Sequence, residues 1–582
     1  MLIHVRRFRE WLEETHSTGF ELRRHFFRRF FDSELVSTPG QWRVVAGGAI
    51  AIVMSISLVF IQAYYHKYAM LDALPTSEPY RLAVLADVLF AIALSMAIVG
   101  LFTTLLWPSL FPGLRDYLAF ASLPIRTRDV FVAKFTALLT FAAAFTAATT
   151  LLPSVVLAAV MTQHRNGGHG QGLLQLPAIF LSASVASLFI FFLLVALQGV
   201  LLNLLPVREF PRISLAVQGV LLTLFLCALP LVCSIPSLAS SMTARPPWAI
   251  WTPPIWFLGL DQVIAGNRDP FAFRLAEMGL TCFAGAAAAA IVTYLWSYRR
   301  HKNRLLLCPT LEKASGLGWP AALADRFIPN PRELAVFAFV AKTLGRSRQH
   351  RMVLTGFSAI AFAVIFESIV SLAFSGGYHA ISAHTAALRQ VVISAPLALS
   401  LFVLCGFRYL FRLPVELRAN WVFRMNEPGN RLILLAGVER FLLYCAVLPV
   451  ALITMPFEMR FLGAMSGGVA TLACLLSSLA LMELLLMQSE KIPFTSSYLP
   501  GRQPLILTVV LYAVAVILYV SILANVVNWC LHSTGSEVAL IVGLLAVWWK
   551  ARTTRRDLRQ FGQLEFEEII EPAVQTLSIE RH

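Results

Sequence analysis

The chain has 582 residues, of which 58% are hydrophobic and only 14% are charged. Soluble globular domains carry about 25% charged residues, so this composition excludes a soluble globular protein. It indicates an all-helical integral membrane protein with many spans. The formal net charge of +15 does not indicate a nucleic-acid partner, because the Lys and Arg residues fall between the apolar segments, where membrane topology explains them.

Two common kinds of site are not predicted. The eight cysteines form no CxxC pair, which argues against a disulfide framework or a zinc site. No stretch fits GxxxxGK[ST], so we expect this chain to bind no nucleotide, cofactor or metal itself. His164 and His169 lie in an outer loop that contains the glycine-rich turn Gly167–Gly172, and we expect them to be solvated.

Residues 1–41 contain no apolar run of signal-peptide length, so we expect the chain to start in the cytoplasm. Over Glu21–Phe31 the arginines and the aromatic residues segregate to two sides of a helix. This pattern predicts an amphipathic helix in the cytoplasmic membrane interface. The aromatic residues expected to insert toward the lipid are Phe26, Phe27, Phe30 and Phe31.

About twelve apolar segments of about 20 residues follow, which is the length that crosses a hydrocarbon core of about 30 Å. In the first half the predicted spans are Trp42–Tyr65, Leu82–Trp107, Val132–Met161, Leu176–Leu205, Ile213–Ile235 and Leu275–Trp296. In the second half they are Met352–Phe374, Val391–Leu410, Phe441–Met455, Phe461–Leu486, Pro504–Val527 and Val538–Trp549.

The distribution of basic residues supports this count. With the N-terminus inside a bacterial inner membrane, nearly all Lys and Arg face the cytoplasm, as does the C-terminus. The basic residues left outside are Lys67, Arg81, Arg165, Arg245, Arg268, Arg274, Arg389 and Arg460.

The chain is predicted to consist of two similar halves. Each opens with a basic amphipathic stretch, ELRRHFFRRFFDSEL or FVAKTLGRSRQHR, and each has a long polar excursion between its second and third spans. Two parallel six-span units explain this pattern. The predicted boundaries are an N-terminal helix at 1–41, a first half at 42–296, a basic linker at 297–351, a second half at 352–549 and a cytoplasmic tail at 550–582.

These two excursions are the most informative feature of the sequence. The first is Phe111–Phe135, FPGLRDYLAFASLPIRTRDVFVAKF, and the second is Leu413–Phe441, LPVELRANWVFRMNEPGNRLILLAGVERF. Both are polar and basic, so neither can remain in lipid. We expect each to form a short cytoplasmic helix tied at both ends to helices that cross the membrane.

An outer segment at Ser241–Phe273 is rich in Trp and Pro and too interrupted to span the bilayer. It is either a gate over the exit of a pathway or an aromatic anchor at the outer interface. The residues concerned are Trp251, Pro253, Pro254, Trp256 and Phe257.

Ionisable residues inside spans are candidates for function, because burying a charge in a bilayer is costly. The candidates are Asp87, Glu277, Glu367 and Glu483. None lies at the predicted membrane centre, and no His or Lys lies at a matching depth. We therefore favour helix–helix hydrogen bonds, or the lining of a polar vestibule, over a proton relay.

The order of an amphipathic helix, two spans, a Leu-Arg-aromatic helix closed by Leu-Pro, four more spans and an aromatic outer segment resembles the permease subunits of ABC-2 type exporters. In that family the helix between the second and third spans docks on a separate ATPase. The resemblance implies a transport subunit that is not itself an enzyme, and two copies of an ATPase that bind ATP and Mg²⁺. The second half departs from the pattern in having only a five-residue external loop, PFEMR (456–460), and no counterpart of WTPPIWF.

Matching positions place the first coupling helix at Leu114–Ser122. An aromatic side chain in a partner's pocket, flanked by charges that set the register, is a common way for a small interface to bind. The residues implied in ATPase coupling are Arg115, Asp116, Tyr117, Leu123, Pro124, Arg126, Arg128 and Asp129 in the first half, and Arg418, Asn420, Trp421, Phe423, Arg424, Glu427 and Pro428 in the second.

Two other functions fit the span count. A secondary carrier of the six-plus-six kind would move its substrate with an ion gradient and no ATPase. A membrane enzyme acting on lipid-linked sugars would present acidic or His side chains on its loops, whereas these loops are basic. The sequence does not identify the transported substrate, although the scarcity of charges in the spans favours a hydrophobic or amphiphilic one.

Overall fold

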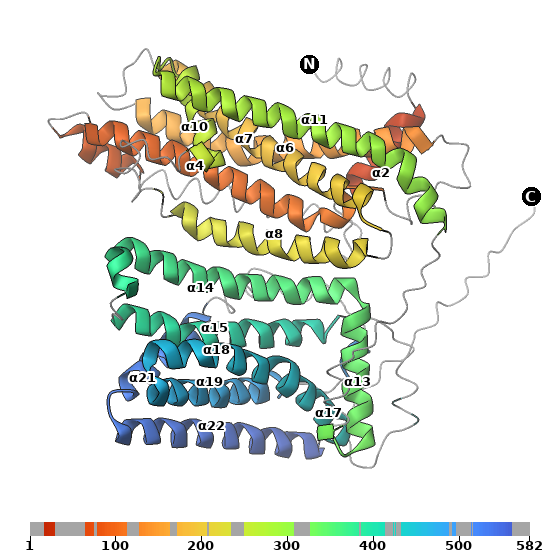
Figure 1. Ribbon diagram of the computed structural model, residues 1–582, viewed down its shortest axis with the longest axis vertical. Coiled ribbons are helices and arrows are strands. Elements are labelled where there is room, and N and C mark those ends of the chain that lie inside the picture. Colours follow the sequence, from red (N-terminus) through yellow and green to blue (C-terminus); the bar gives the residue numbers. More distant parts are fainter. Residues whose placement is uncertain are drawn as a thin grey trace, which may run out of the picture. The chain divides into compact units, whose positions relative to one another are not determined.

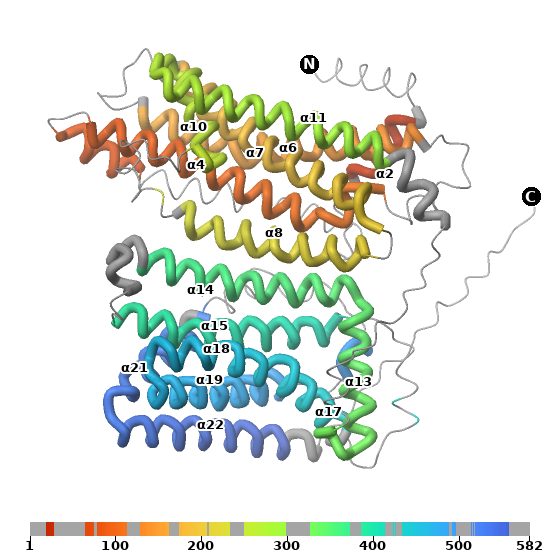
Figure 2. Tube along the Cα trace, viewed as in Figure 1, coloured from red at the N-terminus to blue at the C-terminus, as the bar shows by residue number. Residues whose placement is uncertain are grey.

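The computed structural model describes residues 17–29, 64–74, 78–112, 127–162, 172–206, 209–233, 235, 250–307, 326–382, 386–413, 423, 425, 432–487, 492–495, 514 and 516–561. Within these ranges all regular structure is helical, as predicted (Figure 1). The chain divides into two compact units, Met1–Leu311 and Glu312–His582. Their order along the chain can be followed in Figure 2.

Ten helices in the described ranges are long and apolar enough to cross a membrane, so the chain is a multi-pass membrane protein. In the first unit these are α4 (Glu78–Leu105), α6 (Thr127–Thr162), α7 (Gly172–Leu204), α8 (Phe210–Cys233) and α11 (Pro270–Leu307). They match the second to sixth predicted spans. The first predicted span lies outside the described residues except for its last two positions.

The second unit contains the other five. They are α14 (Arg348–Ser382), α15 (Ala386–Leu410), α19 (Ala464–Leu485), α22 (Thr534–Phe561) and a continuous helix made of α17 (Leu432–Leu442), η5 (Leu443–Val447) and α18 (Leu448–Leu462). Of the eleventh predicted span the structure describes mainly η6 (Ile517–Ile522) and α21 (Leu523–Cys530). The predicted total of twelve depends on this span and the first.

The prediction of an external loop at 456–460 is wrong. α18 continues through Pro456 to Leu462, and the chain reverses at Gly463, where φ is +93°. Glycine adopts this left-handed conformation without a steric penalty, so one residue is enough for the reversal. The ninth span is therefore much longer than predicted.

A wide helical turn precedes Pro449 in this helix. Residues Leu443–Val447 form the π-helical segment η5, and Pro449 follows in the first turn of α18. Proline donates no backbone hydrogen bond, and its ring crowds the carbonyl of Cys445, four residues earlier. A π-type turn relieves this crowding without breaking the helix.

The two units repeat the same packing of helices. In the first unit α4 contacts α6, α7 and α8, and α7 also contacts α6 and α11. In the second unit α15 contacts α18, α19 and α21, and α19 also contacts α18 and α22. Corresponding spans thus have corresponding neighbours. The short helix α10 (Pro253–Ile264) has no counterpart, because only Leu531–Ser533 lie between α21 and α22.

The amphipathic helices α2 (Ser17–Arg29) and α13 (Pro331–Arg346) also correspond. α2 packs on α6, which begins within the first excursion, and α13 packs on α17, which forms the last part of the second. In Figure 1, α13 runs across the ends of the spans of its unit. The predicted insertion of Phe26 into lipid is wrong, because this side chain is 1% exposed in a cluster with Phe131 and Leu138 of α6.

Phe27 of the same helix also contacts α6, with its ring centroid 6.3 Å from that of Phe141. The predicted lipid contacts of Phe30 and Phe31 lie outside the described residues. The aromatic side of α2 that the structure describes therefore packs on the protein's own bundle.

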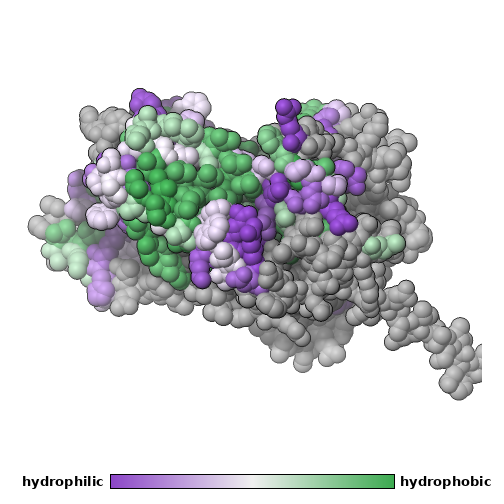
Figure 3. Space-filling view, turned by 90° about the horizontal axis from the view of Figure 1, so that it is seen from below, coloured by the Kyte–Doolittle hydropathy of each residue, from purple (hydrophilic) through white to green (hydrophobic). Residues whose placement is uncertain are grey.

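The surface of α22 shows where this helix leaves the apolar layer. Val538, Val542, Leu545 and Trp549 are exposed, and Lys550 follows at once. Viewed from the side of α22, the surface has a hydrophobic patch with hydrophilic residues at its edges (Figure 3). Tryptophan and lysine in this order are typical of the boundary between hydrocarbon and headgroups.

Candidate functional site

The two ends of the first excursion are held together by a buried lysine. Lys134 of α6 donates a hydrogen bond from Nζ to the carbonyl oxygen of Phe111, at 3.0 Å. The same ammonium group lies 5.3 Å from the ring centroid of Phe26 in α2. A lysine in an apolar layer needs such partners to offset its desolvation, so this residue ties α2, α6 and the start of the excursion into one structure.

Aromatic packing strengthens this junction. The ring of Tyr294 in α11 stacks on Phe111, with centroids 4.7 Å apart. It also contacts Phe131 and Phe135 of α6, at 5.8 and 4.7 Å. Residues on both sides of the first excursion therefore pack on one tyrosine.

Hydrogen bonds between side chains and backbone fix the turn that precedes the first excursion. Trp107 Nε1 donates to Ser214 Oγ of α8 at 2.9 Å, and Gln198 Nε2 of α7 donates to the Trp107 carbonyl at 2.8 Å. Gln218 Nε2 of α8 donates to the Thr104 carbonyl at 2.9 Å. In an apolar surrounding such bonds are costly to break, so the end of α4 has one defined position.

The exit of the second excursion is held by the connector helix α13. Arg440 of α17 forms an ion pair with Glu333 of α13, with Nε and Oε2 2.6 Å apart. A Cβ at Gly437 would lie only 2.5 Å from the Glu333 carbonyl oxygen and 2.9 Å from Val336 Cβ. The two helices therefore touch through backbone at this point, which only glycine permits.

A second ionic group lies beside it. Arg555 of α22 donates hydrogen bonds to Glu439 of α17 and to Glu483 of α19. Arg555 and Glu483 are buried and Glu439 is partly exposed. The C-terminal helix is thereby tied to the helix that leaves the second excursion. Glu483 acts here as an interhelical partner, as the sequence analysis favoured.

The start of the second excursion rests on the loop after α19. The backbone N–H of Phe494 donates to the Phe411 carbonyl at 3.3 Å, and its buried ring contacts His350 and Phe411, at centroid distances of 5.0 and 5.8 Å. Phe494 has φ of 68°, a conformation that costs a bulky residue roughly 1–3 kcal/mol. Burial of its ring stabilises the loop in this position.

Most residues implied in ATPase coupling lie outside the described residues. Arg128 and Asp129 are exposed in the first turn of α6. Phe423 is partly buried, and its ring lies 5.1 Å from that of Phe339 in α13. The coupling residues outside the described ranges are Arg115, Asp116, Tyr117, Leu123, Pro124, Arg126, Arg418, Asn420, Trp421, Arg424, Glu427 and Pro428.

The outer aromatic segment forms α10, which packs on α4, α7 and α11. Phe257 is fully buried against Phe189, at a centroid distance of 5.6 Å, and Trp256 Nε1 donates to the Ile250 carbonyl at 2.7 Å. Trp251 is 85% exposed. The prolines Pro253 and Pro254 form the first turn of the helix, where a missing N–H costs nothing.

α10 also carries a carboxyl group that the sequence analysis overlooked. Asp261 is 8% exposed, and its Oδ1 has no hydrogen-bond partner in the described part of the chain. Burial raises the pKa of Asp261 to about 7. Gly259, two residues earlier, brings α10 so close to α11 that a Cβ there would meet Leu275 Cβ at 2.5 Å.

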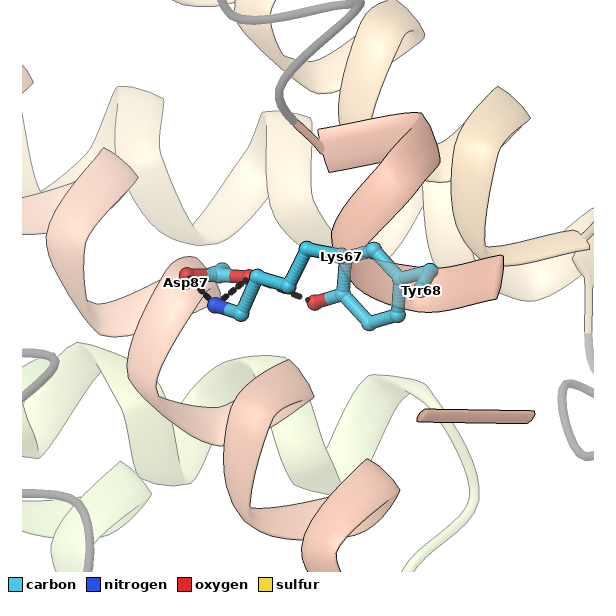
Figure 4. A network of polar contacts seen from close by, with 3 residues as sticks. All are labelled: Lys67, Tyr68 and Asp87. Atoms are coloured by element: carbon cyan, nitrogen blue, oxygen red, sulfur yellow. Dashed lines mark hydrogen bonds and ion pairs between the residues drawn. The ribbon is translucent and has the colours of Figure 1, made fainter. Parts of the chain in front are cut away.

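Asp87 is neutralised by a lysine from outside its span. Lys67 Nζ lies 2.7 and 2.8 Å from the two Asp87 oxygens, and Tyr68 Oη donates to Oδ2 at 2.7 Å (Figure 4). Asp87 is 2% exposed. The three residues fix the helical segment at 64–72 on α4. The carboxylate is fully engaged in helix contacts, as the sequence analysis favoured.

The other two carboxyl candidates, Glu277 of α11 and Glu367 of α14, are exposed on their units. Glu458, which the sequence analysis assigned to a loop, is instead 1% exposed within α18. Sequence patterns could have pointed to Lys134, since it is a lysine just inside a span. No local signal separates Asp261 or Glu458 from ordinary loop residues.

No protein-family model, curated protein or solved structure matches this chain.

Proposed function

We propose that the chain is the translocation subunit of an ATP-driven exporter, in the manner of ABC-2 permeases, located in a bacterial inner membrane with both termini in the cytoplasm. The observation that supports it is that both excursions are anchored in the same way. Each follows the second span of its unit, and an amphipathic helix packs on the helix that leaves it. A polar segment that is anchored at both ends can pass a displacement to the helices that hold it.

Each anchor would pass a displacement of its excursion into the bundle. Lys134 links the first excursion to α2 and α6. The Glu333–Arg440 ion pair links α17 to α13, and Arg555 links it to α19 and α22. In this mechanism two copies of a separate ATPase bind ATP and Mg²⁺ beneath the excursions. Nucleotide binding then draws the excursions together and moves the units to open a path outward.

The decisive experiment is copurification in mild detergent from the native membrane. An ATPase subunit should copurify with the wild-type chain. Tyr117→Ala combined with Trp421→Ala should release it, because aromatic anchors dominate small interfaces and each truncation costs about 2 kcal/mol or more. Trp251→Ala is the matched control, since it removes an exposed aromatic residue from the outer segment. Equal ATPase retention in all three chains would refute the coupling assignment.

A second candidate function is an ion-coupled carrier. Asp261 and Glu458 favour it, because each is a buried carboxyl with no ion-pair partner in the described part of the chain. Such groups occur in proton pathways. Transport by the purified chain in sealed vesicles distinguishes the two functions. A carrier uses an ion gradient to move its solute and needs no nucleotide or ATPase.

A further inference from the structure

Glu458 lies where two helices meet at closest range. It is in the last turns of α18, which reverses at Gly463 into α19. A Cβ at Gly467 would lie 2.6 Å from Met459 Cα and 2.7 Å from the Glu458 carbonyl oxygen. The backbones are therefore in contact, and the Glu458 side chain is enclosed at this contact with 1% of its surface exposed.

The Thr471 hydroxyl lies within hydrogen-bond distance of two oxygens and can donate its one proton to either of them. Thr471 Oγ1 lies 2.9 Å from the Gly467 carbonyl oxygen and 2.5 Å from Glu458 Oε2. A hydroxyl group has one proton and a carbonyl can only accept. If the hydroxyl donates to Gly467, the shorter contact needs a donor on the carboxyl group. A protonated Glu458 supplies it.

In the part of the chain that the structure describes, no cation offsets a negative charge at this position. Within the described ranges Glu458 forms no ion pair with any residue of α15, α17 or α19. The Cys474 thiol of α19 lies close enough to interact electrostatically with the carboxyl, and it brings no positive charge. Arg460, two residues along, is exposed. The helices packed on α18 carry five charged residues in the described ranges: Arg389 and Arg408 of α15, Glu483 of α19, and Glu439 and Arg440 of α17. Glu483 and Glu439 form ion pairs with Arg555, and Arg440 forms one with Glu333.

We propose that Glu458 is a proton-binding site, held as the neutral acid and donating its hydrogen to Thr471 Oγ1. The bound proton closes the outer end of the α18–α19 hairpin. Its loss leaves a buried carboxylate with no cation, so the hairpin has to admit water or open. This inference holds for either candidate function.

Infrared spectroscopy of the purified chain in lipid vesicles tests the proposal directly. A protonated carboxyl group has a carbonyl stretch that a carboxylate lacks. The measurement uses an Asp261→Asn background, which removes one other buried acid, and compares it with Glu458→Gln in the same background, so that the difference reports Glu458 alone. The acid band should be present at pH 7 and lost in the glutamine variant. Glu367→Gln, at an exposed carboxyl on α14, is the control that should keep it.

A second measurement needs no variant. Dicyclohexylcarbodiimide reacts with protonated carboxyl groups in apolar surroundings, and peptide mapping locates the adduct. Glu458 in the wild-type chain should be labelled at pH 7 and less so as the pH rises. Absence of the acid band at pH 7, or a Glu458 peptide that stays unlabelled while another buried carboxyl reacts, overturns the proposal.

Discussion

Asp261 links the stability of the first unit to pH. Burial raises its pKa from 3.8 to about 7, so between these values the folded chain binds a proton that the unfolded chain has released. Stability therefore falls as pH rises through this window, and the full penalty is present above about pH 7. The shift corresponds to roughly 4 kcal/mol at most, at about 1.4 kcal/mol per pH unit.

Asp261→Asn should remove this dependence, because the amide stays neutral at every pH. We expect its thermal unfolding temperature in detergent to exceed that of the wild type at pH 8 and to match it below about pH 4, where the carboxyl is protonated in both the folded and the unfolded chain. Glu277→Gln, at an exposed carboxyl of α11, should change neither value. A difference between Asp261→Asn and wild type that is the same at both pH values would contradict the assignment.

Arg555 is expected to be the most sensitive residue of the second unit. Replacement by alanine leaves Glu483 and Glu439 facing each other without a cation, and breaking a buried ion pair in this way costs about 3–5 kcal/mol. Arg556→Ala removes an exposed arginine from the next position of the same helix and should change stability by less than about 0.5 kcal/mol. Similar losses in the two variants, measured by thermal unfolding, would show that the cluster contributes little.

At the scale of elements, hydropathy located the described spans but not all of their ends. The ninth span was predicted as Phe441–Met455 because charged residues flank it at both sides. In the structure Glu439 forms an ion pair with Arg555 of α22, and Arg440 forms one with Glu333 of α13. Both partners lie on other helices, more than a hundred positions away in the sequence. A sequence window contains no information about such partners, so the helix could not be extended through them.

The contact between α13 and α17 gives a prediction about an element. Gly437→Ala places a Cβ 2.5 Å from the Glu333 carbonyl oxygen, so α13 has to move, at a cost of about 1–3 kcal/mol. On the proposed function it should also reduce substrate-stimulated ATP hydrolysis in the assembled complex. Gly543→Ala, in open space on α22, should be neutral or gain up to about 1 kcal/mol. Equal stability of the two variants would exclude a tight junction.

At the scale of the whole molecule, the repeat was visible in the sequence as two similar excursions and two basic amphipathic stretches. The shared packing of α4 with α7 and of α15 with α19 could not be predicted, since it arises from contacts far apart in the chain. Of the site, the excursions were predicted from the sequence, and their central residues lie outside the described ranges. Their anchors were not predicted, because Tyr294 and Arg555 have no local signature that separates them from ordinary helix residues.

The even number of spans can be tested by labelling intact cells with a membrane-impermeant maleimide. Gly168→Cys, between the third and fourth predicted spans, should react from outside. Cys308 in the linker and Ser578→Cys in the tail should react only after permeabilisation, and a Cys308→Ser chain supplies the background. Reaction of Ser578→Cys from outside would mean an odd number of spans in the second half.

The helix that follows the second excursion runs without a break from the junction with α13 to the Glu458 hairpin. Its membrane part, Leu434–Leu462, has 29 residues and is about 44 Å long at 1.5 Å per residue. On the two proposals made above, this single helix joins the cytoplasmic excursion to the protonated turn at Glu458. We then expect a rotation of its inner end to reach Thr471, apart from the twist that the π segment at Leu443–Val447 absorbs.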